Sequence, residues 1–163
     1  MNADQTTTLI ACAIVRRNGE ILLVRQRDKD GTTNWALPGG AAESAEALFE
    51  TLTREIHEET GLNVLEAGPI AYAAELLQPR AIAFVFEVLR WSGDLLPADP
   101  DDDILEAAFM PVTDALDRLQ GQSSHFVRTP LLTYLRGTLR SGTLLSFRRD
   151  SSTDTLIRHG PGA

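Results

Sequence analysis

The sequence has little that would tie it to a membrane or an oxidising compartment. Cys12 is its only cysteine, so no disulfide can form within one chain, and its apolar surroundings predict a buried side chain. No apolar run approaches the ~20 residues that a membrane-spanning helix needs. Residues 1–8 are polar and uncharged apart from Asp4, which is not a signal-peptide pattern. We therefore expect a cytoplasmic protein that does not bind membranes.

Positive charge is also scarce. The 163 residues include 15 Lys and Arg against 23 Asp and Glu, which gives a formal net charge of −8. A chain of this sign is not expected to bind nucleic acid polymers through its overall charge. An anionic small molecule would therefore have to be bound by a metal ion and by local arginines. The length fits one core, so we expect residues 1–163 to form a single domain.

Hydrophobic patterning predicts strands before and after one helix. Two strands, 8–15 and 20–27, are joined by a turn at Asn18-Gly19, and residues 81–91 form a strand that is apolar on both faces. Such a strand needs cover on both sides. Later helices are expected from Thr113 to Leu119 and from Thr129 to Leu135. This order predicts an α/β fold with a central mixed sheet between helices.

The last part of the chain, 140–163, has two interpretations. Residues 143–147 and 155–158 have the composition of the two strands of a hairpin, whereas the polar run 150–153 favours a disordered end. A homodimer contact through this extension is a further alternative that the sequence leaves open.

The segment from Gly40 to Leu62 is the most informative part of the chain. Ser44 is the expected N-cap of a helix, and Gly61 is expected to end it in the left-handed conformation. The residues expected on its core face are Ala45, Leu48, Phe49, Leu52 and Ile56. The polar residues expected on the opposite face are Glu46, Glu50 and His57.

Three glutamates near the end of this helix indicate a cation site. Glu55, Glu58 and Glu59 stand at i, i+3 and i+4, so their side chains converge. Carboxylates this close repel unless a cation lies between them, and Mg²⁺ prefers oxygen ligands and binds substrate phosphates. Arg54 has the spacing to reach Glu50 or Glu58 and hold that carboxylate in place.

The same residues match a known signature at every fixed position. The pattern G-x5-E-x7-R-E-U-x-E-E-x-G-U, with U aliphatic, resembles that of the Nudix hydrolase family. Its fixed positions are Gly40, Glu46, Arg54, Glu55, Ile56, Glu58, Glu59, Gly61 and Leu62. The preceding segment 35–40 resembles the usual entry to this motif. Ala45 stands where many members have glycine, and we expect alanine to fit because the position opens the helix.

The resemblance covers about residues 8–135 and implies a Nudix-type α/β/α sandwich. It implies a hydrolase that uses Mg²⁺ or Mn²⁺ to cleave the phosphoanhydride bond of a nucleoside diphosphate joined to another group. It also implies that Glu55, Glu58 and Glu59 are catalytic metal ligands, that the Gly40 carbonyl is a further ligand, and that Arg54 orients a ligating carboxylate. Glu46 would support the site.

A second acidic segment is a candidate source of the general base. Residues 103–109, D-I-L-E-A-A-F, resemble a family segment that often supplies a catalytic acid. That segment usually begins with glutamate, and Asp103 is one methylene shorter. Glu106 and Glu55 are therefore alternatives to Asp103, whereas residues 99–102 are expected to be a solvated loop.

Substrate contacts are the least determined feature. Arg25 and Arg27 share one face of their strand and can meet phosphates, although a solvated face explains them equally well. Trp35 can stack on a base or anchor the core. Arg80 falls in a segment that shapes substrate choice in this family. These four residues are the expected substrate-binding set.

Three functions are compatible with the motif. The first is hydrolysis of nucleoside diphosphate derivatives, with a pyrophosphatase that removes oxidised nucleotides as the alternative within that class. The second is a regulatory nucleotide-binding module without turnover. The third is an isomerase of isoprenoid diphosphates, which needs a catalytic cysteine in the pocket; Cys12, on an early apolar strand, is a poor candidate.

Overall fold

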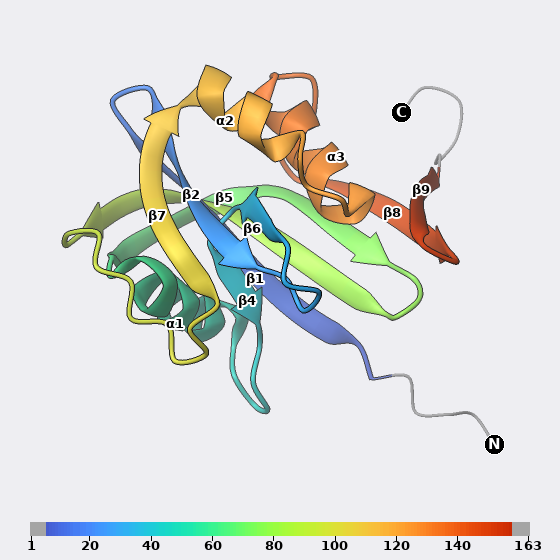
Figure 1. The fold of residues 1–163 in the computed structure, drawn as a ribbon, viewed down its shortest axis with the longest axis horizontal. Coiled ribbons are helices and arrows are strands. Elements are labelled where there is room, and N and C mark those ends of the chain that lie inside the picture. The colour runs from blue at the N-terminus through green and yellow to red at the C-terminus, as the bar shows by residue number, and fades with distance from the viewer. Residues whose placement is uncertain (1–5, 158–163) are drawn as a thin grey trace.

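The computed structural model describes residues 6–157, which form one mixed sheet with helices on both faces (Figure 1). The elements in chain order are β1 (Thr8–Arg17), β2 (Glu20–Arg27), β3 (Thr33–Ala36), β4 (Gly39–Ala41), α1 (Leu48–Thr60), β5 (Asn63–Leu76), β6 (Ala81–Ser92), β7 (Ile104–Pro111), α2 (Val112–Leu119), α3 (His125–Leu135), β8 (Thr143–Asp150) and β9 (Thr153–Ile157). The predicted α/β/α arrangement is confirmed.

Alternation along β1 explains the two layers. Ala13 and Val15 pack with Leu52 of α1, whereas Ile14 between them packs with Leu119 of α2. Successive side chains of a strand point to opposite faces, so one apolar strand contributes to both cores. Burial of the two apolar faces of the sheet therefore fixes α1 on one side and α2 with α3 on the other.

The sheet order is β3-β2-β1-β6-β5-β8-β9, with β4 beside β1 and β7 beside β2. β1 runs parallel to β6 and β5 runs parallel to β8, whereas the other pairs are antiparallel. The predicted turn between the first two strands is present, with positive φ at both Asn18 and Gly19. β5 is the longest strand, and its pairing to β6 shifts register repeatedly.

The motif helix begins later than its sequence predicts. α1 starts at Leu48 with Ala47 as its N-cap, so Ser44 is not the cap. Residues 43–47 form a turn instead, in which Ala45 has a φ of 63°. Phe49 is 50% exposed and is not a core residue, whereas Leu52 and Ile56 are fully buried. The predicted end is correct, because Gly61 adopts the left-handed conformation with a φ of 81°.

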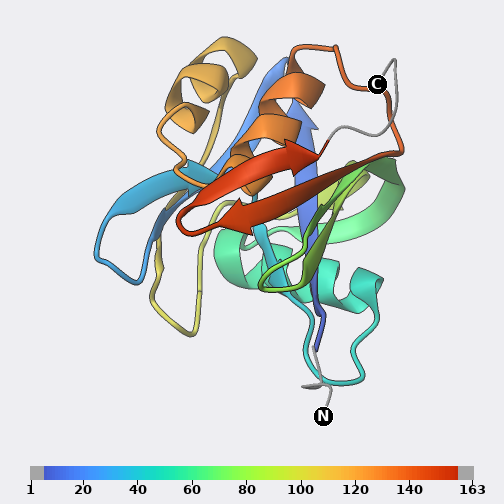
Figure 2. The same ribbon diagram turned by 90° about the vertical axis from the view of Figure 1, so that its right-hand side faces the viewer.

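The C-terminal extension forms the hairpin β8–β9. β8 adds to the sheet beside β5. In the run 150–153, whose polarity suggested disorder, Asp150 pairs with Thr153 and residues 151–152 make the turn between the two strands. Arg158, the last residue of the expected second strand, lies outside the described residues. Figure 2 shows this hairpin in front of the sheet with α3 beside it. α3 itself begins at His125, four residues before the expected start at Thr129.

Candidate active site

Two glycines bring the β4 backbone against its neighbours. A Cβ atom on Gly39 would lie 2.3 Å from the carbonyl oxygen of Ala11 on β1, and its φ of 145° is one that few other residues adopt. A Cβ atom on Gly40 would lie 2.5 Å from the carboxylate of Glu55. The glycines therefore place the entry to the motif directly against the glutamates of α1.

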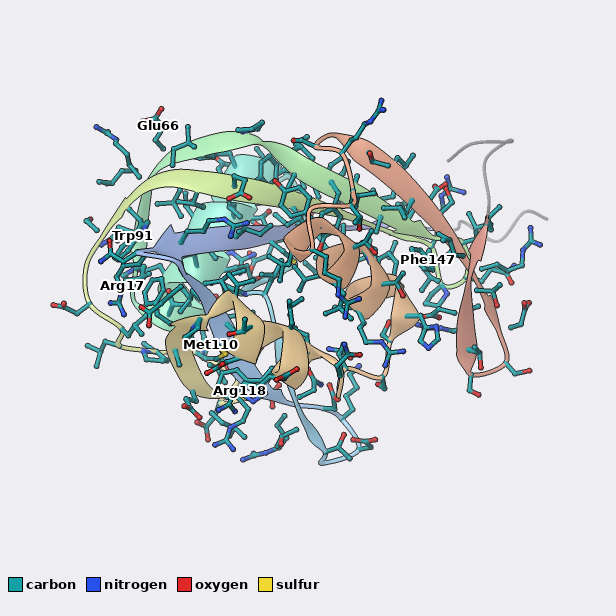
Figure 3. All side chains as sticks on the ribbon, turned by 90° about the horizontal axis from the view of Figure 1, so that it is seen from above. Arg17, Glu66, Trp91, Met110, Arg118 and Phe147 are labelled. Atoms are coloured by element: carbon teal, nitrogen blue, oxygen red, sulfur yellow. The ribbon has the colours of Figure 1, made fainter. Side chains whose placement is uncertain are left out.

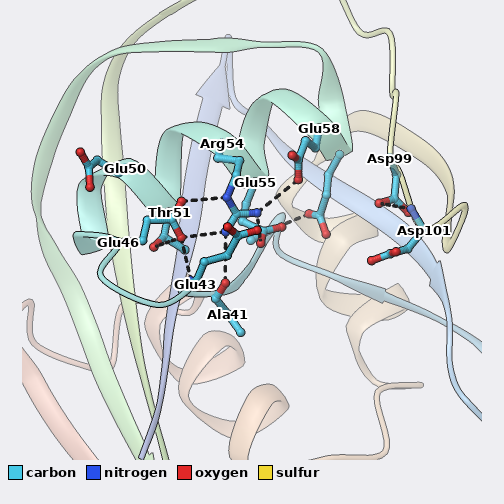
Figure 4. Close-up of polar contacts among 12 residues, drawn as sticks. Ala41, Glu43, Glu46, Glu50, Thr51, Arg54, Glu55, Glu58, Asp99 and Asp101 are labelled. Carbon is cyan, nitrogen blue, oxygen red and sulfur yellow. Dashed lines mark hydrogen bonds and ion pairs between the residues drawn. The ribbon is translucent and has the colours of Figure 1, made fainter.

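Arg54 is the centre of an ion-pair network (Figure 4). Its guanidinium donates to both carboxylate oxygens of Glu46, from Nε at 2.8 Å and from Nη2 at 2.9 Å. Nη1 donates to Glu55 at 2.7 Å and to Glu58 at 3.3 Å, and Nη2 donates to the carbonyl of Ala41 at 3.2 Å. The predicted pair with Glu58 is present, whereas Glu50 instead accepts a hydrogen bond from the amide of Ala47.

Glu46 faces this network. The helical pattern had wrongly placed it on the face opposite the core. It lies before the first turn of α1, so helical periodicity does not apply to it. Its carboxylate also accepts hydrogen bonds from Thr51 Oγ1 and from the amide of Glu43, each at 2.9 Å. The Arg54 guanidinium and these donors lower the pKa of Glu46 to about 2. Glu46 is therefore a permanent anion that orients Arg54.

Glu59 is the most buried of the three motif glutamates. It is 8% exposed, and its Oε2 accepts a hydrogen bond from the amide of Gly39 at 2.8 Å. Burial raises the pKa of Glu59 to about 8, with the charges of Glu55, Asp99 and Glu58 adding to the rise. Burial also raises the pKa of Glu55, against the opposing effect of Arg54. Both carboxylates would gain from a nearby cation.

The donor set suits a hard divalent cation. Glu55, Glu58 and Glu59 supply carboxylate oxygens, and Glu55 lies against Gly40, whose carbonyl is the fourth expected ligand. In residues 6–157 no three acidic, histidine or cysteine side chains are already grouped closely enough to hold a metal ion. Glu55 and Glu58 are instead paired with Arg54. The oxygen donors present fit a divalent cation, and the metal site itself stays a prediction.

The acidic loop before β7 contributes a residue that the sequence pattern assigned to solvent. The loop is tied to α1, because the amide of Ala98 donates to the carbonyl of Glu58 at 2.8 Å. Asp99 lies beyond the C-terminal end of α1 in Figure 4, and its charge contributes to the raised pKa of Glu59. Its own carboxylate accepts the amides of Asp103 at 2.7 Å and Ile104 at 3.1 Å. Asp99 also accepts the amide of Asp101, two residues later, at 3.3 Å. This turn pattern is the local signal that could have singled out Asp99 in the sequence.

The two candidates for the general base in this segment lie in different settings. Asp103 is exposed, and its backbone carbonyl accepts a hydrogen bond from the amide of Arg27 at 2.8 Å. Glu106 lies on β7, where it forms an ion pair with Arg25 at 3.4 Å. The role of Asp103 as base stays a prediction.

A pocket lies between the sheet and α3, and one of its lining residues is Gly39. Most of the lining is apolar, contributed by β1, β5, β6 and α3. Its polar side chains include Gln26 and Gln122. Gln122 is 5% exposed and held in place, since its Nε2 donates to Asn34 Oδ1 at 2.9 Å and its Oε1 accepts the amide of Ser124 at 3.2 Å. No residue in 6–157 forms a hydrogen bond to the Gln26 side chain, so its amide is available in the pocket.

None of the four expected substrate-binding residues lines this pocket. Arg25 is paired with Glu106, and Arg27 and Arg80 are exposed. Trp35 packs against the core, with the guanidinium of Arg118 4.9 Å from its ring centre. Pocket-lining residues that the sequence did not single out are Gln26, Gln122 and Phe126. Sequence alternation separated Gln26 from Arg25 and Arg27, but it could not show that a register shift between β2 and β7 falls at this point.

Cys12 packs against the core, as expected, and it also lies in the pocket wall. Desolvation, together with the charges of Glu59 and Glu55, raises the pKa of its thiol to about 12. A thiol with this pKa stays protonated near neutral pH and is a weak nucleophile. The position of Cys12 therefore fits a cysteine mechanism better than the sequence suggested. Its raised pKa does not fit such a mechanism.

No helix within residues 6–157 has the length and apolar character needed to cross a membrane.

Comparisons with known proteins agree with this geometry. Residues 6–130 match the model of the NUDIX domain family. An 8-oxo-dGDP phosphatase, NUDT18 of Danio rerio, is 31% identical over 101 residues, which are 61% of this chain and 30% of that protein. The nucleoside triphosphatase NudI of Escherichia coli is 41% identical over 58 residues, which are 34% of this chain and 41% of that protein. The chain thus spans less than half the length of these relatives.

Solved structures give the same result. The MutT NUDIX hydrolase of Burkholderia pseudomallei is 26% identical, with a TM-score of 0.61 over 77% of this chain and 96% of that one. A MutT protein from Bacillus halodurans is 18% identical and superposes over 93% of this chain and 95% of that one with a TM-score of 0.68, which shows the shared fold. With its family model matched over residues 6–130 and the motif residues gathered around Arg54, the chain belongs to the Nudix hydrolase family.

Proposed function

We propose that this chain catalyses divalent-metal-dependent hydrolysis of the phosphoanhydride bond in nucleoside diphosphate derivatives, releasing a nucleotide and the phosphorylated second group. The observation that carries the proposal is the position of Gly39. It lines the pocket, and its amide donates to the carboxylate of Glu59. A nucleobase in the pocket would therefore place its phosphates beside the motif glutamates.

The side chains of the motif divide the work of such a reaction. Glu55, Glu58, Glu59 and the Gly40 carbonyl would hold Mg²⁺ or Mn²⁺, which when bound supplies neutralisation of phosphate charge and a lower pKa for a bound water. Arg54 orients Glu55 and Glu58. The base is an acidic side chain: Asp103 as first choice, or Glu55, whose raised pKa suits proton uptake.

Within this class, a nucleoside di- or triphosphate is a second candidate substrate, including oxidised forms. The similar proteins named above are an 8-oxo-dGDP phosphatase and a nucleoside triphosphatase. The pocket supports the same candidate, since a largely apolar cavity with the amides of Gln26 and Gln122 suits a planar base with polar edges.

A substrate screen with Mg²⁺ and Mn²⁺ tests the proposal. The panel holds ADP-ribose, nucleotide sugars, dinucleoside polyphosphates, cofactor dinucleotides, and canonical and oxidised dNTPs and dNDPs. Glu59→Gln is run beside the wild type, with Glu43→Gln, an exposed glutamate outside the helix, as control. We expect Glu59→Gln to lower kcat about a hundredfold or more without unfolding the protein, because it loses a metal ligand.

Each outcome has a distinct meaning. Loss of turnover in Glu59→Gln and in EDTA, with Glu43→Gln unaffected, supports the metal mechanism. Wild-type turnover in Glu59→Gln at saturating Mg²⁺ removes Glu59 from the metal site. Nucleotide binding without turnover across the panel favours a regulatory binding module. Turnover that is retained after alkylation of Cys12, which lines the pocket, excludes a cysteine mechanism.

A further inference from the structure

The β8–β9 hairpin lies beyond residue 130, where the match to the family model ends. It nevertheless contacts α3, the helix that forms one wall of the pocket. Phe147 of β8, labelled in Figure 3, is fully buried. It packs edge-on against Phe126 of α3, with ring centres 6.0 Å apart. Phe126 lines the pocket. The extension is therefore in contact with a pocket residue.

The N-terminus of α3 lacks the local groups that usually satisfy a helix start. Ser124 is the N-cap residue, but its side chain makes no capping hydrogen bond to the helix, and the first turn holds no acidic residue. The first amides of a helix have no partner within it, so they need acceptors from elsewhere. The carbonyl of Ser124 accepts the amide of Val127 at 3.2 Å, but the amide of Phe126 has no such local acceptor among the described residues.

Asp154 of β9 supplies the acceptor from 28 residues away in sequence. Its Oδ2 accepts the amide of Phe126 at 3.2 Å and the hydroxyl of Ser124 at 2.9 Å. Arg149 donates to the same carboxylate from Nε at 2.7 Å and from Nη2 at 3.2 Å, which orients it. Asp154 is 5% exposed, so this charge is buried and fully partnered.

A series of hydrogen bonds connects Asp154 to the polar side chains of the pocket. Ser124, whose hydroxyl is bound by Asp154, donates its amide to Gln122 Oε1 at 3.2 Å. Gln122 in turn donates to Asn34 at 2.9 Å. One carboxylate thus fixes the segment that carries both Gln122 and Phe126, one polar and one aromatic residue of the pocket.

We propose that Asp154 is a positioning residue: it fixes the start of α3 and, through it, sets the affinity and base selectivity of the pocket. The C-terminal hairpin is then part of the substrate-binding apparatus, although none of its described residues lines the pocket. This inference rests on the proposed function for its substrate, and on the hydrogen bonds of Asp154 for its mechanism.

Kinetics of the full chain test the effect on substrate. The variants are Asp154→Ala, Asp154→Asn and Ser124→Ala, with Asp150→Asn, an exposed aspartate on the same hairpin, as control. For the preferred nucleotide we expect Asp154→Ala to raise KM about tenfold and to leave kcat within about threefold, because binding geometry is lost and the motif is not. Ser124→Ala should change KM in the same direction by less, and it keeps the test usable if Asp154→Ala does not fold.

Amide hydrogen exchange gives a readout that does not depend on turnover. We expect the amides of Phe126 and Val127 to exchange about tenfold faster or more in Asp154→Ala, with those of α1 unchanged. Raised KM together with faster exchange in α3 supports the proposal. Unchanged KM with only a lower melting temperature, or unchanged exchange in α3, overturns it.

The two proposals fail separately. If the wild type turns over no nucleotide but binds one, its dissociation constant replaces KM in the same comparison. If the wild type neither binds nor hydrolyses any nucleotide, the proposed function fails, and the exchange data still decide whether Asp154 holds α3.

Discussion

Glu46 and Arg54 form a two-pronged ion pair across eight residues, with both carboxylate oxygens bound at 2.8 and 2.9 Å. The pair closes the turn that precedes α1 onto the helix. Since Arg54 also donates to Glu55 and Glu58, the turn and the expected metal ligands share one guanidinium. A change at this pair should therefore affect the metal site without removing a ligand.

Arg54→Lys is expected to weaken Mn²⁺ binding about 10- to 100-fold, because an ammonium group cannot bind Glu46 with two prongs while holding Glu55. Titration with Mn²⁺ followed by electron paramagnetic resonance measures the affinity. Arg90→Lys is the control, since Arg90 pairs with Glu66 on the exposed surface. Equal Mn²⁺ affinity in the two variants would show that Arg54 does not orient ligands.

Gln26→Leu is expected to raise KM for the preferred nucleotide about tenfold, since the base would lose one hydrogen bond in the pocket. Discrimination between bases should fall with it, because the lost group reads a polar edge. Steady-state kinetics on matched purine and pyrimidine substrates measure both effects. Gln120→Leu, at an exposed position outside the pocket, should leave both unchanged. Retained KM in Gln26→Leu would place the base elsewhere.

Ala45→Gly is expected to stabilise the protein by about 0.5–1 kcal/mol. Ala45 has a φ of 63°, a left-handed conformation that is strained for alanine and not for glycine. Glycine also gives the unfolded chain more conformational entropy, which destabilises the fold, but we expect this effect to be smaller than the relief of strain. Urea unfolding measures the difference. Gly19→Ala is the opposite substitution and serves as control. Gly19 has a φ of 82° and nothing lies within 4 Å of an added Cβ, so we expect backbone strain alone to make this variant less stable. A less stable Ala45→Gly would mean that the turn tolerates alanine, as the sequence had suggested.

Asp154 should give the hairpin a pH-dependent stability. Desolvation acts to raise the pKa of Asp154, but hydrogen bonds from Arg149, Ser124 and the Phe126 amide outweigh it, so the pKa lies below 3.8. Its stabilisation is therefore complete above pH 3.8 and is lost as pH falls through the folded-state pKa.

We expect Asp154→Asn to lower the free energy of unfolding by about 1–2 kcal/mol at pH 7, and the gap to the wild type to close below pH 3.8. Urea unfolding at a series of pH values from 7 to 3 measures this gap. Asp150→Asn serves again as the exposed control. A gap that is constant over this range would show that the charge of Asp154 contributes nothing.

The sequence by itself determined the motif and its geometry along the helix. Spacing of 3.6 residues per turn brings Glu55, Glu58 and Glu59 to one side of α1, and alternation places β1 between two cores. Both follow from local backbone geometry, so they can be read without knowing which other segments are near. The C-terminal glycine of α1 was predictable for the same reason.

Only the tertiary structure decided which side chains from distant segments meet in the site. Glu46 reaches Arg54 because the chain turns before the helix, and Asp154 reaches α3 because the hairpin joins the sheet. The charge of Asp99 acts on Glu59 because the loop before β7 is tied to α1. The pocket likewise combines residues from β1, β2, β5, β6 and α3. These contacts join segments far apart in sequence, and their geometry depends on how the buried faces of the whole sheet pack, which no local pattern records.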